Sequence, residues 1–234
     1  MKPVFIVAVD GPAGTGKSSV TKRIADLFGL IHVDTGALYR GVAHLCFEAG
    51  FGLDFLASDY PAIVAITENS KFEFKRIKDK NSRNALFVNN KDVTAQLRTP
   101  DMGMMASKVS AIPGVRAALI GLQRTLGKSA PSILEGRDIG TVIFPDANLK
   151  FFLTASIDER AKRRLAELEA QDGDTPSFEE LREQIRVRDL GDSTRAIAPL
   201  KMAEGAIAID TTSQTLDEVV ELISKTIREK FSEA

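Results

Sequence analysis

The chain has 234 residues, of which 44% are hydrophobic and 27% are charged, and its formal net charge is −1. This composition fits one large α/β domain with insertions, or two small domains. The balanced charge provides no basic field for a nucleic acid or an anionic membrane, so we expect a small ligand held by local cations. The single cysteine, Cys46, excludes an internal disulfide; we expect a buried structural thiol in a reducing cytoplasm. We also expect no signal sequence and no membrane span.

A glycine-rich motif follows the first predicted strand, the apolar run 4–9. Its spacing is G-x-x-x-x-G-K-[ST], with the fixed positions Gly11, Gly16, Lys17 and Ser18. Small residues let successive backbone N–H groups surround an anion, and the helix that follows adds its own free N–H groups. Lys17 adds a positive charge, and the hydroxyl of Ser18 or Ser19 can join the shell of a magnesium ion. The motif therefore predicts a phosphate-binding loop; the alternative is a glycine-rich turn without a ligand.

The rest of the chain alternates between short apolar runs and segments with helical spacing. Further strands are predicted at 30–34, 132–136, 150–153 and 206–210. Helices are predicted at 37–49, in two pieces of 100–127 divided at Pro113-Gly114, at 156–170, at 178–190 closed by Gly191, and at 216–231. This alternation predicts a parallel five-stranded sheet with helices on both faces. We expect the polar strand ends Asp34-Thr35, Arg137-Asp138 and Asp210 to converge at its carboxyl edge.

Residues 51–99 have a different pattern. The alternating stretches 72–75 and 85–88 flank a charged turn at 78–84, which is typical of a hairpin with a solvated tip. The segment is therefore predicted to be a small antiparallel insert. A second break, polar and containing Gly and Pro, is found at 171–176.

Several arginines are found at helix starts or where strands meet loops, where they could stabilise charge on a transferred phosphate. They are Arg40, Arg116, Arg137, Arg188 and Arg195. Asp138 and Asp192 are interpreted as hydrogen-bond acceptors for a ligand or as partners that hold an arginine in place. A phosphate acceptor needs no base to remove a proton, whereas a hydroxyl acceptor does. His32 and His44 are expected to be packed or edge residues rather than bases.

Six segments carry a resemblance to a known family. They are 10–19, Asp34-Thr35-Gly36-Ala37-Leu38-Tyr39-Arg40, Pro113-Gly114-Val115-Arg116, 135–145, 188–192 and Arg195-Ala196-Ile197-Ala198-Pro199-Leu200. At these segments, and along nearly its whole length, the chain resembles the bacterial cytidylate kinases. The resemblance implies a P-loop, adenylate-kinase-like α/β fold: a single domain over 1–234 with a nucleoside-monophosphate (NMP) binding region at 36–99 that includes the β insert. It also implies a short lid region at about 160–188.

The resemblance further implies a cytoplasmic monomer that uses ATP with Mg²⁺ to phosphorylate CMP and dCMP, without nucleic-acid or membrane partners. The implied ATP-binding residues are Gly11, Pro12, Ala13, Gly14, Thr15, Gly16, Lys17, Ser18, Ser19, Arg160 and Arg164, with Ser18 also at the metal. The last two would be lid arginines that stack on adenine, although Arg163 is equally well placed. The implied catalytic residues are Lys17, Arg137 and Arg195.

The implied CMP contacts are divided by the part of the nucleotide that they face. Cytosine would be faced by Thr35, Arg116 and Asp138. The phosphate would be held by Arg40, Arg137 and Arg195. The residues at the sugar would be Ser107, Arg188 and Asp192. Physical chemistry supports the assignment of Asp138 to cytosine. Its carboxylate can accept a hydrogen bond from the cytosine amine, whereas uracil would place a second acceptor, a carbonyl oxygen, against it.

Two other functions share part of this pattern. A P-loop kinase for a small metabolite such as a sugar acid would have the same arginines but would need a base. A nucleotide-dependent switch or ATPase could use the strand 206–210 to bind magnesium, although the sequence has no Asn-Lys-x-Asp motif. Such a protein would hydrolyse its nucleotide without an acceptor.

Overall fold

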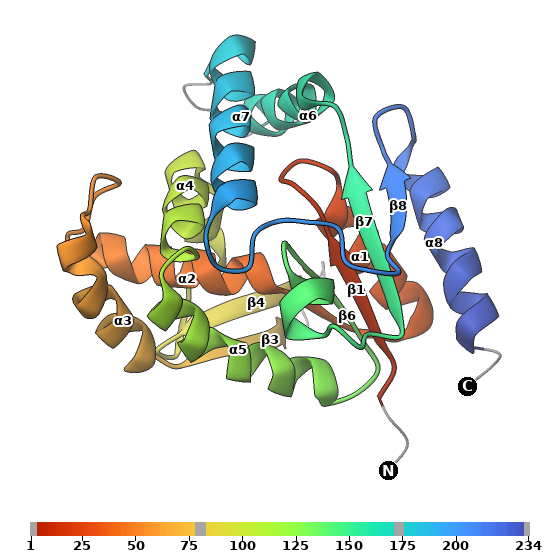
Figure 1. The fold of residues 1–234 in the computed structure, drawn as a ribbon, viewed down its shortest axis with the longest axis horizontal. Coiled ribbons are helices and arrows are strands. Elements are labelled where there is room, and N and C mark those ends of the chain that lie inside the picture. The colour runs from red at the N-terminus through yellow and green to blue at the C-terminus, as the bar shows by residue number, and fades with distance from the viewer. Residues whose placement is uncertain (1–3, 78–82, 171–175, 232–234) are drawn as a thin grey trace. The chain divides into compact units, whose positions relative to one another are not determined.

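A computed structural model describes residues 4–77, 83–170 and 176–231 (Figure 1). The chain forms two compact units. The sheet unit consists of Met1–Asp34 and Arg124–Ala234, and the inserted unit consists of Thr35–Gln123. Each unit has its own apolar core. The expected NMP-binding region, 36–99, falls within the inserted unit.

The sheet unit is built on five parallel strands in the order β2-β6-β1-β7-β8 (Figure 1). Their bounds are Ile6–Asp10 for β1, Ile31–Asp34 for β2, Ser132–Gly136 for β6, Leu149–Thr154 for β7 and Ile207–Asp210 for β8. Every residue of β1 and β6 is buried, which explains their apolar runs at 6–9 and 133–134. The predicted parallel sheet is confirmed.

Two helices cover one face of this sheet. The helix α1 (Lys17–Phe28) contributes Ile24 to the core, and α8 (Leu216–Phe231) contributes Ile223. Both pack with Val9 of β1 in a single buried cluster. A short π-helical turn, η3 (Ile139–Ile143), contacts β1 and β6. This turn was not predicted from the sequence.

The helices α6 (Ile157–Glu169) and α7 (Phe178–Thr194) are joined by two ion pairs. Arg160 contacts Asp189 at 2.6 Å, and Arg182 contacts Asp158 at 2.7 Å. Serine side chains, Ser156 and Ser177, cap the two helix starts. The lid was expected around a break at 171–176, of which 171–175 lie outside the described residues.

The prediction that Gly191 ends α7 is wrong, because the helix continues to Thr194. The Gly191 carbonyl accepts the N–H of Arg195 at 3.2 Å, as inside a helix. The extra turn carries Asp192, which is buried and bonded to Arg137. A tertiary contact thus extends the helix past a residue whose intrinsic helix propensity is low.

The inserted unit combines helices with a small antiparallel sheet. Its helices are α2 (Thr35–Glu48), α3 (Tyr60–Glu68), α4 (Pro100–Val109) and α5 (Pro113–Lys128), of which α5 continues into the sheet unit, with short 3₁₀ turns η1 (Ala57–Asp59) and η2 (Thr94–Arg98). The predicted hairpin is confirmed as β3 (Phe72–Ile77) and β4 (Arg83–Val88). Its expected turn, 78–84, lies outside the described residues up to 82, and the last two positions belong to β4.

A third strand, β5 (Lys91–Asp92), extends this small sheet and was not predicted. It follows a two-residue turn in which Asn89 and Asn90 have φ of 49° and 68°. Two left-handed residues are typical of a tight hairpin turn, and asparagine tolerates that conformation. The Asn-Asn pair was therefore a local signal for β5.

The core of the inserted unit joins α2, α4 and α5, through residues such as Leu38, Met105 and Leu119. Cys46 lies in this core, as predicted, and burial raises the pKa of its thiol to about 11. The thiol is therefore protonated at neutral pH. In the part of the chain that the structure describes, no single helix is long and apolar enough to span a membrane; α4 and α5 meet the criterion only as a pair bent by 96°.

Candidate active site

The phosphate-loop motif lies between β1 and α1 and curls as predicted. Gly11, Gly14 and Gly16 have φ of 144°, 79° and 83°. A Cβ at Gly11 would overlap the Leu153 carbonyl oxygen of the neighbouring strand, so only glycine fits there. Gly16 precedes α1 without a side-chain hydrogen bond to the helix start. The first N–H groups of α1 are thus left for an anion.

The carbonyl groups of the loop are held by side chains of the motif itself and of other parts of the sheet unit. The Pro12 carbonyl accepts from Thr15 Oγ1 at 3.1 Å and from Lys17 Nζ at 2.5 Å. Arg160 donates to the Ala13 carbonyl at 3.2 Å, and Thr211 Oγ1 donates to the Thr15 carbonyl at 3.2 Å. These bonds fix the loop through its carbonyl groups, and its N–H groups are the backbone donors that can bind phosphate oxygens.

Lys17 is buried in a strongly cationic environment. Burial first, and then the charges of Arg137 and Arg188, hold the pKa of Lys17 well below its usual value, while Glu135 and Asp10 oppose the shift. The repulsion among these three cations, and the burial of Lys17, raise the free energy of the protein without a ligand. A bound phosphate would relieve this repulsion. This cluster is the electrostatic centre of the candidate site.

Four predicted acceptor-side residues form two ion pairs within the sheet unit. Arg137 Nε donates to Asp192 Oδ2 at 3.0 Å, and Arg195 lies 3.8 Å from Asp138 Oδ1. Arg195 Nε also donates to the Ala198 carbonyl at 2.7 Å. Each aspartate thus holds an arginine in place, which was one of the two interpretations made from the sequence.

The other predicted CMP contacts lie on helices of the inserted unit: Thr35 and Arg40 on α2, Ser107 on α4 and Arg116 on α5. Among the described residues, Arg116 is the largest of the fully buried side chains. It donates to the Ser110 carbonyl at 3.4 Å, and its guanidinium lies 5.8 Å from the ring centroid of Tyr39. Burial of an arginine to this degree is unusual outside ion pairs and ligand sites.

The three candidate lid arginines of α6 differ in their surroundings. Arg160 is buried and donates to Ala155, Ala13 and Asp189. Arg163 donates to the Thr211 carbonyl at 2.6 Å. Arg164 donates to Glu167 at 2.9 Å, and its side chain is 28% exposed, as is that of Arg163. Arg160 therefore supports the phosphate loop from behind, and Arg163 anchors α6 to the segment after β8.

The expectation that the polar strand ends converge is wrong for the pair Asp34 and Asp210, whereas Asp34 lies in register with Glu135 of the neighbouring β6, two residues before Arg137. Both lie at the carboxyl edge of the sheet, but they end the outermost strands β2 and β8. Four strand spacings separate these strands, or about 19 Å. Asp210 instead accepts hydrogen bonds from its neighbour Thr212.

Sequence reasoning missed two carboxylates at the ends of the central strands. Glu135 of β6 accepts from Ser18 Oγ at 2.7 Å and from Thr21 Oγ1 at 3.1 Å, and it lies 2.9 Å from His32 Nε2. Asp10 ends β1 and accepts from backbone N–H groups of η3. The rule that polar strand ends mark the site would have found both, but it was not applied to β1, and at β6 it was applied only to Arg137-Asp138.

The oxygen donors beside the phosphate loop determine whether it can hold a magnesium ion. No group of three His, Cys, Asp or Glu side chains suited to a metal is found among the described residues. The Ser18 hydroxyl and the Glu135 carboxylate, 2.7 Å apart, are both hard oxygen donors next to the phosphate loop. Mg²⁺ in kinases is held by one or two protein oxygens together with water and substrate phosphates. The donor set fits such an ion.

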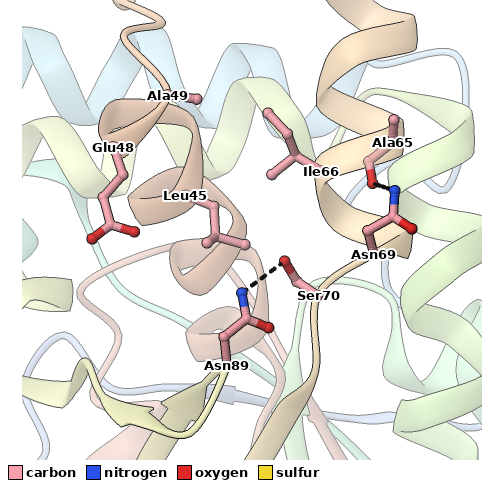
Figure 2. A pocket seen from close by; sticks show the side chains of 8 residues that line it. All are labelled: Leu45, Glu48, Ala49, Ala65, Ile66, Asn69, Ser70 and Asn89. Carbon is pink, nitrogen blue, oxygen red and sulfur yellow. Dashed lines mark hydrogen bonds between the residues drawn. The ribbon is translucent and has the colours of Figure 1, made fainter.

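A surface depression of about 490 Å³ lies within the inserted unit, between the ends of α2 and α3 and the small sheet (Figure 2). Its lining includes Leu45, Ile66 and Asn89, with Asn89 bonded to Ser70 (Figure 2). It contains none of the predicted site residues. We therefore place the candidate site at the phosphate loop and its arginines.

Comparison with known proteins identifies the family. The family model described as cytidylate kinase matches residues 7–229. The chain belongs to the cytidylate kinase family. A cytidylate kinase of Geobacter sp. (strain M21) is 44% identical over 97% of this chain and 94% of its own length, and one of Shouchella clausii is 44% identical over 96% of each chain.

The same region also occurs inside longer proteins. It matches a bifunctional pantoate ligase/cytidylate kinase of Acaryochloris marina at 44% identity, covering 97% of this chain but 42% of that protein. Among solved structures, an uncharacterized protein from Eubacterium ventriosum is similar with a TM-score of 0.50 and 13% identity, covering 96% of this chain and 98% of that one. This last similarity concerns the fold alone.

Proposed function

We propose that this member of the cytidylate kinase family transfers the terminal phosphate of ATP to CMP and dCMP. The observation that carries the proposal is the phosphate loop with the buried Lys17 beside Arg137 and Arg188. A loop of N–H donors and several fixed cations is what phosphoryl transfer requires, because the reaction is accelerated mainly by positioning and by stabilising charge on the transferred group.

On the donor side, the loop N–H groups and Lys17 bind the ATP phosphates. Ser18 is the proposed magnesium ligand, and Glu135 orients its hydroxyl. Magnesium, when bound, neutralises charge on the donor phosphates. Arg160 stabilises the loop by donating to the Ala13 carbonyl. Of the two predicted lid arginines, Arg164 is the better placed to contact adenine, because its side chain is partly exposed and that of Arg160 is buried.

On the acceptor side, Arg137 and Arg195 hold the phosphate of CMP. An oxygen of that phosphate attacks the terminal phosphorus of ATP, the bond to the bridging oxygen breaks, and ADP leaves with the electron pair. The attacking oxygen carries no proton that must be removed, so the mechanism needs no general base. Asp138 and Asp192 keep the two arginines in place before the nucleotide binds.

Asp138 is the proposed reader of cytosine. Its side chain is 7% exposed, so water cannot easily replace a ligand group that fails to bond to it. The amine of cytosine donates to this carboxylate, whereas uracil would present a carbonyl oxygen. The remaining proposed contacts, Thr35, Arg40, Ser107 and Arg116 of the inserted unit and Arg188 of the sheet unit, follow the family resemblance.

The proposal is tested by coupled ADP release with ATP and Mg²⁺, with CMP, dCMP, UMP, AMP and no acceptor in parallel. We expect strong turnover with CMP and dCMP and little with the others. Turnover without an acceptor would instead indicate an ATPase or switch. Absence of turnover with CMP would favour a kinase for another small metabolite, such as a sugar acid.

A further inference from the structure

Asp10 joins the end of β1 to the start of η3. It is 3% exposed and directly precedes Gly11 of the phosphate loop. Its Oδ1 accepts the N–H of Ile139 at 2.8 Å, and its Oδ2 accepts the N–H of Gly140 at 2.7 Å. Both carboxylate oxygens are therefore bonded to consecutive backbone groups of one turn.

The two N–H groups are the first of the π-helical turn. Inside η3, the Asp138 carbonyl accepts from Val142 and Ile143, and the Ile139 carbonyl accepts from Phe144. The first N–H groups of any helical turn have no partner within it, and Asp10 supplies that partner here. Because these groups directly follow Asp138, the carboxylate of Asp10 fixes the backbone that carries the proposed cytosine reader.

The fit between Asp10 and η3 is tight. A Cβ added at Gly140 would lie 3.3 Å from Asp10 Oδ2, 3.2 Å from the Cβ of Ala203 and 3.3 Å from Cδ of Lys150. Burial raises the pKa of Asp10 to about 6, against the opposing effect of its two backbone hydrogen bonds; Asp138 raises it further and Lys17 lowers it. Above that pH the side chain is ionised, so both oxygens are free to accept.

We propose that Asp10 is a positioning residue for acceptor selection, which holds Asp138 in place through the backbone of Ile139 and Gly140. This inference rests on the proposed role of Asp138 in reading cytosine. Asp10 therefore acts on the acceptor side of the reaction, although it lies next to the phosphate loop that binds the donor. Asp10 itself does not touch the substrate.

The test is Asp10→Asn, with kcat/KM measured for CMP and for UMP and with KM measured for ATP. Asparagine has nearly the same shape but offers one accepting oxygen, so one N–H of η3 loses its partner. A small displacement of a positioning group costs up to about 100-fold in rate. We expect the CMP-to-UMP ratio of kcat/KM to fall at least about tenfold, and KM for ATP to change less than about threefold.

The matched control is Asp210→Asn, which alters another strand-end carboxylate that accepts a backbone N–H, that of Thr212. It should leave the ratio unchanged. Gly140→Ala perturbs the Asp10 contact from the opposite side without altering the carboxylate, and it should lower the ratio in the same direction. This second variant keeps the inference testable if Asp10→Asn does not fold.

An Asp138→Ala background separates the two proposals. If Asp138→Ala removes the preference for CMP, then Asp10→Asn should cause no further loss of that preference in the same chain. If Asp138→Ala removes the preference but neither Asp10→Asn nor Gly140→Ala lowers it, the role of Asp10 is refuted and the proposed function stands. If Asp138→Ala keeps the preference, the base assignment itself fails. An equal rise in KM for ATP and CMP would also contradict the positioning role.

Discussion

Glu135 connects three side chains that local sequence patterns treat separately. It accepts from Ser18 and Thr21 of α1 and contacts His32 of β2. Burial lowers the pKa of His32. The hydrogen bond and charge of Glu135, together with the charges of Asp34 and Asp26, raise the pKa by more than burial lowers it, so the net shift is upward. His32 is thus a packed partner of a buried carboxylate, as predicted.

This pair predicts a pH dependence of stability. A histidine whose pKa is raised by folding contributes stability that is fully present below its unfolded pKa and lost as the pH rises through the folded value. We expect His32→Gln, which keeps a neutral donor, to be less stable than the parent chain at about pH 5.5 to 6, with the gap shrinking toward pH 8. Denaturant unfolding across this pH range measures the gap.

The control for this experiment is His44→Gln, which removes the other histidine of the chain from a surface pair with Glu48. Such a pair contributes little. A stability gap for His32→Gln that is the same at every pH would contradict the assigned ion pair.

At the scale of elements, α7 shows how a long-range contact overrides a local signal. Gly191 looks like a helix end in the sequence, yet it lies inside the helix, and an added Cβ would meet no described atom within 4 Å outside the backbone of its own helix. We expect Gly191→Ala to raise the free energy of unfolding by about 0.5 to 1 kcal/mol, because glycine loses more backbone freedom in a helix. Thermal unfolding measures this gain.

Gly11→Ala is the contrasting substitution, since its Cβ would overlap the Leu153 carbonyl at a left-handed φ of 144°. It should lower both stability and turnover. A loss of stability in Gly191→Ala would mean that α7 is not a regular helix at that position.

The difference between local signals and long-range contacts also explains which features could be predicted from the sequence. Strands, helices and the phosphate loop were predictable because periodicity and a fixed motif are local signals. The contacts that complete the site are not local: Ser18 and Glu135 are 117 residues apart, Asp10 and Gly140 are 130 apart, and Thr15 and Thr211 are 196 apart. The turn η3 was missed for the same reason, because its first N–H groups depend on Asp10. Its position after Arg137-Asp138 was the one available hint.

At the scale of the whole molecule, the chain leaves the sheet unit at Asp34 and returns at Arg124. The inserted unit has its own core around Leu119, and the sheet unit has its core around Ile223. Two separate cores allow the units to lose structure separately. Location in the cytoplasm and a monomeric state stay predictions from the sequence.

This organisation predicts where core substitutions act. Leu119→Ala and Ile223→Ala should each destabilise their own unit by about 2 to 5 kcal/mol, because each leaves a cavity. Hydrogen exchange should accelerate first within 35–123 for Leu119→Ala, and first in the remaining segments for Ile223→Ala. Equal acceleration along the whole chain in both variants would contradict two separate cores.

The central claim is that the turn after β6 selects the acceptor through Asp138. The most direct test is the ratio of kcat/KM for CMP over UMP in the parent chain and in Asp138→Ala. Our account predicts a high ratio in the parent and a loss of at least about tenfold in the variant, because a buried carboxylate that opposes the uracil carbonyl has been removed. An unchanged ratio in a folded variant would contradict it.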